Sequence, residues 1–91
     1  MKVQTVTYPV ILHPNHGNYD VLIPDIDKGV WIRGAGVTSA LTAAHDVIGK
    51  LLAIAAELPR PTDSNQLELA DGDVVHQVTV NLAEFRLHEP V

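Results

Sequence analysis

The stretch VWIRGAGVTSALTAAHDVIGKLLAIAAEL, residues 30–58, decides the fold because its hydrophobic period changes partway along. Val30 and Ile32 share one face at a period of two, which predicts a short strand over residues 30–33. After two glycines, apolar residues recur at steps of three and four, which predicts a helix of about five turns over residues 37–58. The prolines that follow are expected to end this helix, since the residue before a proline avoids the helical conformation. The positions predicted to face the core are Val37, Leu41, Ala44, Ile48, Leu51, Leu52, Ala55 and Leu58.

Two further strands are predicted before this stretch. Residues 3–13 are rich in β-branched side chains, and residues 19–24 form an apolar run after a cluster of turn-forming residues. Pro9 has no N–H for a sheet ladder, so the first strand is expected either to be unpaired on one side at that point or to bend there. With residues 30–33, these strands predict a three-stranded meander. The residues sharing one face of the first strand are Val6, Tyr8, Val10 and Leu12.

A loop and a fourth strand are predicted after the helix. Residues 60–73 lack periodicity and contain Pro, Asp, Asn and Gly, which indicates a mobile surface loop. Residues 74–82 alternate again, which predicts a strand. The order β-β-β-α-β predicts an α+β fold, an antiparallel-rich sheet with one long helix packed on one face, because a helix cannot bury its apolar stripe alone. We expect one domain over residues 1–91, with no C-terminal DNA-binding module.

Composition limits the classes of function. The chain has no cysteine and no apolar run near the roughly 20 residues of a membrane span, so a cytoplasmic protein without membrane contact is expected. Its net charge is −5, and residues 61–85 contain no Lys or Arg, which disfavours direct nucleic-acid binding. An acidic surface favours a basic protein partner, although a charge that only keeps the domain soluble is an equal alternative.

Two sets of residues are candidates for contacts with other proteins. Trp31 and Arg33 share one face of the short strand and form an aromatic-plus-arginine pair of the kind enriched at binding hot spots. The alternative is that Trp31 covers a subunit or the edge of the core. The helix also carries apolar residues off its core-facing line, which either pack against another subunit or are tolerated small groups. These oligomer-packing candidates are Ala40, Ala43, Val47 and Ile54. A homo-oligomer is expected because a chain this short gains stability by association.

Several stretches resemble the HicB antitoxins of bacterial toxin–antitoxin systems. They are YPVILH at residues 8–13, YDVLIPDI at residues 19–26, the helix entry at residues 34–44, and VTVNLAEF at residues 78–85. The resemblance implies a partly degraded ribonuclease-H-like fold that has lost nuclease activity. It also implies that the chain binds HicA, a small basic toxin that cleaves mRNA with a histidine, and neutralises the toxin by covering that histidine.

This hypothesis gives five candidate partner-binding residues, which are Tyr19, Asp25, Asp27, Trp31 and Arg33. The chain departs from the family at two places within the domain. It has KGVW after the Pro-Asp turn, where family members often carry Gly-Cys, and TSA at the start of the helix, where family members usually carry acidic residues.

Two other functions are alternatives. One is an orphan, self-assembling structural or adaptor protein of mobile-element origin. The other is a residual metal-dependent nuclease that uses Asp20, Asp25 and Asp27, since such a site needs several carboxylates that converge on metal ions. Acidic residues are common in turns for local hydrogen bonding, so we expect these aspartates to be structural. The sequence therefore predicts a binding protein that is not an enzyme, with no catalytic residue, metal or cofactor.

Overall fold

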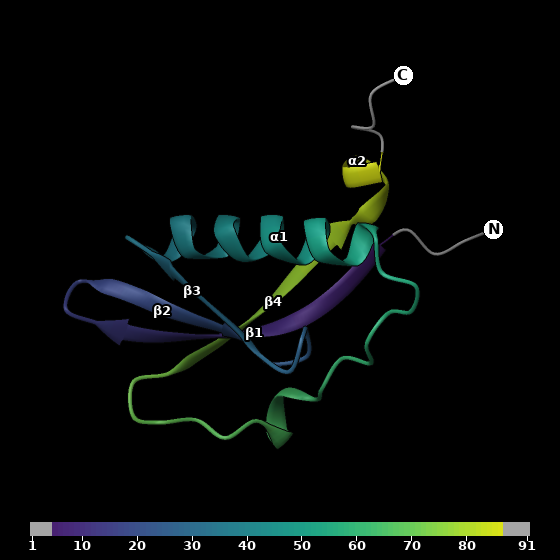
Figure 1. The fold of residues 1–91 in the computed structure, drawn as a ribbon. Helices are drawn as coiled ribbons and strands as arrows, with labels where there is room; N and C mark the ends of the chain where they lie inside the picture. Colours follow the sequence, from purple (N-terminus) through teal and green to yellow (C-terminus); the bar gives the residue numbers. More distant parts are fainter. Residues whose placement is uncertain (1–4, 87–91) are drawn as a thin grey trace.

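The computed structural model describes residues 5–86, so the first two residues of the strand predicted over residues 3–13 lie outside the described part. A four-stranded sheet carries one long helix on one face, and residues 63–73 run along the other face (Figure 1). This confirms the predicted α+β fold and its β-β-β-α-β order. The elements are β1 (Thr5–Asn15), β2 (Asn18–Ile23), β3 (Val30–Gly34), α1 (Val37–Ala53), the 3-10 turn η1 (Ser64–Gln66), β4 (Val74–Asn81) and α2 (Leu82–Arg86).

All neighbouring strands in the sheet are antiparallel, in the order β3-β2-β1-β4. The pairing of β1 with β2 begins at Ile11, whereas its pairing with β4 extends from Thr5 to Leu12. At Pro9, strand β1 therefore has β4 on one side and no strand of residues 5–86 on the other. This agrees with the first of the two alternatives predicted for Pro9, that the strand is unpaired on one side there.

The core lies between α1 and the sheet. It contains the predicted inner face of β1, with Tyr8, Val10 and Leu12 almost fully buried, together with residues of β2 and β4. On the helix, Ala44, Ile48 and Leu52 are buried as predicted. Val37, Leu51 and Leu58 were also expected in the core, but they are 40%, 39% and 42% exposed.

The helix is rotated from its predicted orientation because its first turns lie very close to β3. A methyl group added to Gly34 would come within 2.5 Å of the backbone nitrogen of Ala40, so only small residues fit at this contact. The contact places the Ala40 side of α1 against the sheet. Ala40, one of the candidates for packing against another subunit, is therefore fully buried in the core of this chain.

The helix ends at Ala53, before the predicted end at residue 58. Tertiary hydrogen bonds hold the chain that follows. The hydroxyl of Tyr8 donates to the carbonyl of Pro59 at 2.6 Å, and the backbone N–H and hydroxyl of Thr62 donate to Asp25 at 2.9 and 2.5 Å. Desolvation by burial, together with the charge of Asp25, raises the pKa of Tyr8. These contacts hold the chain at residues 59 and 62, beyond the end of the helix.

The connection between α1 and β4 is irregular, as predicted for residues 60–73, except for the 3-10 turn η1. Hydrogen bonds connect this segment to the sheet near residue 64 and again near residue 73. The amide of Gln77 donates to the hydroxyl of Ser64 at 2.7 Å, and His13 Nδ1 lies 2.5 Å from a carboxylate oxygen of Asp73. Beyond β4, residue 82 was predicted as strand but begins α2.

Candidate partner-binding surface

The sheet face opposite α1, here called the outer face, follows directly from the strand register. Directly paired residues of an antiparallel sheet share a face, and successive residues alternate between faces. Ile11 pairs with Leu22, and Leu22 pairs with Trp31, so these three side chains form one row across the outer face. The neighbouring row consists of His13, Asp20 and Arg33. These two rows are the floor of the candidate surface.

Trp31 is a large apolar side chain that is 62% exposed on the outer face, on the edge strand β3. Beside it the loop forms a hollow of about 390 Å³, here called the Trp31 groove. Its lining also includes Leu69, which is 47% exposed. Two large apolar side chains are thus available on one concave surface, which is characteristic of protein-binding sites. The residues lining the Trp31 groove are Ile11, Leu22, Trp31, Glu68, Leu69, Ala70 and Asp73.

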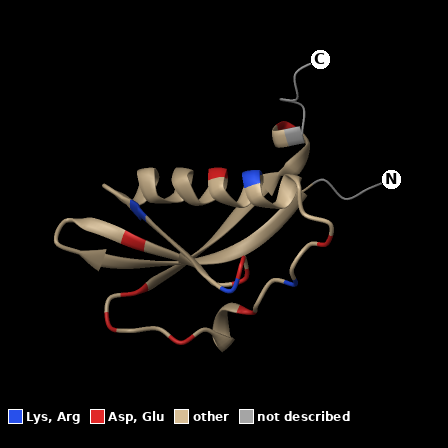
Figure 2. Cartoon of the chain, in the orientation of Figure 1, with Lys and Arg blue, Asp and Glu red and all other residues tan. Residues whose placement is uncertain are grey.

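The loop side of the groove is acidic. Figure 2 shows acidic residues spread along the segment beneath the sheet. In the sequence, no Lys or Arg lies between Arg60 and Arg86. In Asp73, desolvation opposes ionisation, but hydrogen bonds from His13 and the Ala70 N–H outweigh it, so the pKa of Asp73 is lowered. The groove therefore combines an apolar floor with a negatively charged rim.

The cation nearest in sequence to Trp31 on the same face is already paired. Nε of Arg33 donates to Oδ1 of Asp20 at 3.2 Å, and the side-chain amide of Asn15 donates to the other oxygen of Asp20 at 2.9 Å. The hydrogen bond from Asn15 is the main cause of the lowered pKa of Asp20, and Arg33 adds to it. Asp20 thus compensates the charge of Arg33, which leaves the local potential to the acidic loop.

The five predicted partner-binding residues do not form one site. Trp31 and Arg33 lie together on the outer face and line a shallow hollow with Asp20. The side chain of Tyr19 lies on the helix side of β2, where it is half-buried against the core. Asp25 is occupied by Thr62, and Asp27 lies in the exposed β2–β3 turn, where it lines a separate hollow near the end of α1.

The remaining oligomer-packing candidates on α1 differ in exposure. Ala43 and Val47 are half-buried, and Val47 packs against the core. Ile54, at the C-terminal end of the helix, is 85% exposed. Of the four candidates, Ile54 therefore offers the largest free apolar surface.

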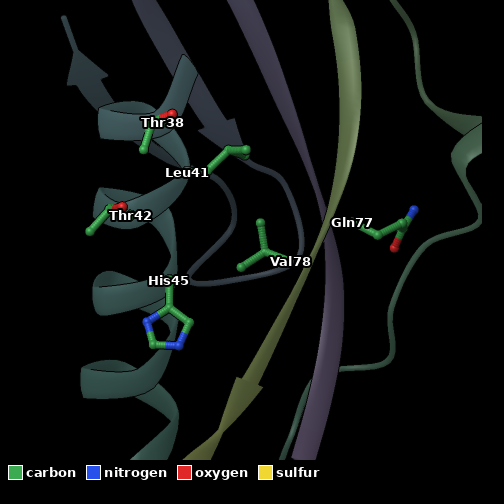
Figure 3. Close-up of a pocket in the computed structure, with 6 residues that line it drawn as sticks. All are labelled: Thr38, Leu41, Thr42, His45, Gln77 and Val78. Atoms are coloured by element: carbon green, nitrogen blue, oxygen red, sulfur yellow. The ribbon is translucent and has the colours of Figure 1, made fainter. Parts of the chain in front are cut away.

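Another hollow, of about 380 Å³, lies between α1 and β4. Figure 3 shows Leu41 and His45 from the helix and Val78 from the strand pointing into it, whereas Gln77 points away from the helix. Its lining contains no Asp, Glu, Lys or Arg. This hollow therefore lacks the acidic residues that line the Trp31 groove.

The carboxylates considered for a nuclease do not converge. Asp20 is held by Asn15 and Arg33 on the outer face, and Asp25 is held by Thr62 at the turn after β2. Within residues 5–86, no three His, Asp or Glu side chains are grouped so that they could hold a metal ion. Asp20 and Asp25 each accept hydrogen bonds from neighbouring side-chain or backbone groups of the fold.

Sequence reasoning found Trp31 but missed the rest of its groove. Ile11 falls on the face of the first strand predicted to be opposite the core, and the register brings Ile11 and Leu22 beside Trp31. An apolar residue on the outward side of two adjacent strands was the available signal. The contribution of Glu68, Leu69 and Asp73 depends on the path of the loop, which has no periodic pattern.

No helix among residues 5–86 is long and apolar enough to cross a membrane. The sequence matches no family model. It also matches no curated protein. The fold is similar to that of a chain in a solved structure described as a toxin–antitoxin complex from Streptococcus pneumoniae, with a TM-score of 0.83 and 24% sequence identity. The similarity covers 96% of this chain and 77% of that chain, and it establishes a shared fold.

Proposed function

We propose that this chain is a HicB-like antitoxin, or a protein derived from one, that binds a small basic HicA-like toxin and masks it sterically. The observation that carries the proposal is the likeness, over 96% of the chain, to a chain from a toxin–antitoxin complex. The segments that resemble HicB antitoxins add support, because they form most of β1 and β2, the start of α1, and the end of β4 with α2.

Steric masking requires an exposed binding surface and no chemistry of its own. The Trp31 groove supplies apolar area for binding, and its acidic rim favours encounter with a basic protein that must itself hold RNA. In this proposal the chain is not an enzyme and uses no cofactor. It acts in the cytoplasm as a homo-oligomer, without direct contact with nucleic acid or membrane.

The test is co-expression with the product of the neighbouring reading frame. We expect that product to be small and basic, to arrest growth when expressed alone, and to be neutralised and co-purified when this chain is present. A neighbouring product that neither arrests growth nor co-purifies would contradict the proposal. The matched control is this chain with Trp31→Ala and Glu68→Gln, purified first to verify that it is folded.

A second candidate is an orphan self-assembling adaptor. It is favoured by the two edge strands of the sheet, β3 and β4, each of which has one neighbouring strand within residues 5–86, and by the exposed Ile54. Light scattering coupled to gel filtration discriminates it. A stable oligomer that Ile54→Asp disrupts, combined with no binding to the neighbouring product, would favour the adaptor over the antitoxin.

A further inference from the structure

Trp31 lies where a binding partner gains most from contact. It is exposed on an edge strand, with Leu22 and Ile11 beside it on the floor of the Trp31 groove and Leu69 on the loop side. Tryptophan is enriched at binding hot spots because it buries a large, rigid surface at low entropic cost. The row of apolar side chains therefore forms a platform for an apolar contact.

The rim of the same groove selects for positive charge. Glu68 is exposed and forms no ion pair with any residue in the range 5–86. Arg33, the cation on the same face, is compensated by Asp20. A guanidinium or ammonium group beside Glu68 would meet a free carboxylate, and the indole of Trp31 offers an aromatic face for a cation–π contact.

We infer that the Trp31 groove is the docking site for the basic partner, and that it receives an arginine or lysine side chain presented next to an apolar residue. This inference rests on the proposed function and names its surface. Phosphate-bearing partners are disfavoured because the acidic rim repels them. A second copy of this chain is disfavoured for the same reason, since it carries a net charge of −5.

Trp31 is the single tryptophan of the chain, so its fluorescence reports directly on the groove. The experiment titrates this chain with the product of the neighbouring reading frame, with the tryptophans of that product replaced by phenylalanine. We expect the emission of Trp31 to move to shorter wavelength and its quenching by acrylamide to fall as the complex forms. In the chain alone, raising the concentration should leave both signals unchanged.

Variants then measure the contribution of each side chain to Kd. Trp31→Ala should weaken binding by about 30-fold, as expected for a hot spot. Glu68→Gln should weaken it by about fivefold and reduce its dependence on salt. The matched controls, Ile54→Ala for an exposed apolar residue and Glu57→Gln for an exposed acid outside the groove, should bind like the wild type. Each variant is checked for an unchanged melting temperature.

The outcomes separate the docking site from the proposed function. If the complex forms but Trp31 keeps its emission and Trp31→Ala binds normally, the docking site is wrong and the proposed function stands. If the neighbouring product does not bind at all, both are wrong. A concentration-dependent shift in the chain alone would assign the groove to self-association and overturn the inference.

Discussion

The two faces of the sheet are built differently although the same four strands form both. On the helix side, α1 covers a continuous layer of aliphatic side chains, and Gly34 and Ala40 allow backbone-level contact. On the outer face, the loop at residues 63–73 is held at a few polar points and leaves Trp31 exposed. The apolar core that stabilises the fold therefore lies on the helix side, and the proposed binding role falls to the outer face.

The largest effect is expected from a cavity on the helix side. Ile48→Ala removes a fully buried side chain and should lower the free energy of unfolding by about 3 kcal/mol. Chemical denaturation measures the loss. The matched variant Leu51→Ala, on the exposed side of the same helix, should cost well under half as much. Equal losses would show that α1 packs with a different face.

The close contact between β3 and α1 gives the next largest effect. Gly34→Ala places a methyl group against the backbone of Ala40 and should destabilise the fold by about 2 kcal/mol. Gly36→Ala is the control, because a methyl group there meets nothing within 4 Å and its backbone is extended. If Gly34→Ala melted at as high a temperature as Gly36→Ala, the side of α1 that carries Ala40 would not pack against β3.

A smaller loss of stability is expected from the hydrogen bonds that hold the chain after α1 to the turn after β2. Asp25→Ala removes the acceptor for both hydrogen bonds from Thr62 and should cost about 1 kcal/mol. It should also speed cleavage after Glu68 by a glutamyl endopeptidase, because the loop loses an anchor. Asp63→Ala, an exposed aspartate without a side-chain cap hydrogen bond, should change neither quantity. Unaltered cleavage in Asp25→Ala would mean that other contacts hold the loop.

The subtlest test concerns pH at the other end of the loop. The pKa of Asp73 is lowered in the folded state, so its stabilising contribution is complete above the ordinary value of 3.8 and is lost as the pH falls through the lowered value. Asp73→Asn should therefore show a smaller decrease in stability between pH 5 and pH 2.5 than the wild type. Asp71→Asn, which leaves the contact between His13 and Asp73 in place, should retain the wild-type decrease. The same decrease in both variants would contradict the role of Asp73.

Much of the fold was predictable because periodicity reports burial. The alternation in β1 and β4 and the three- and four-residue steps in α1 identified the elements and their order. The rotation of α1 was not predictable, since it depends on the close contact between Gly34 of β3 and Ala40 of α1, which the periodicity of neither element reports. The helix end was missed because apolar residues continue past Ala53, where α1 ends, as far as the prolines that were expected to end it.

The candidate site was only partly predictable. Trp31 and Arg33 were identified from residue type and shared strand face, and the acidic bias of residues 61–85 was visible in the composition. Their combination into one groove depends on where an aperiodic loop lies, and the sequence contains no pattern for that. Tyr19 was a candidate contact under the HicB hypothesis, and the register places it on the helix side of β2, packed against the core.

The most direct test of the binding account is amide hydrogen exchange on this chain, free and in complex with the neighbouring product. We predict that binding slows exchange in residues 30–34 and 67–73, which border the Trp31 groove, and leaves residues 45–54 of α1 unchanged. Protection confined to α1, with residues 30–34 and 67–73 exchanging as in the free chain, would contradict the account.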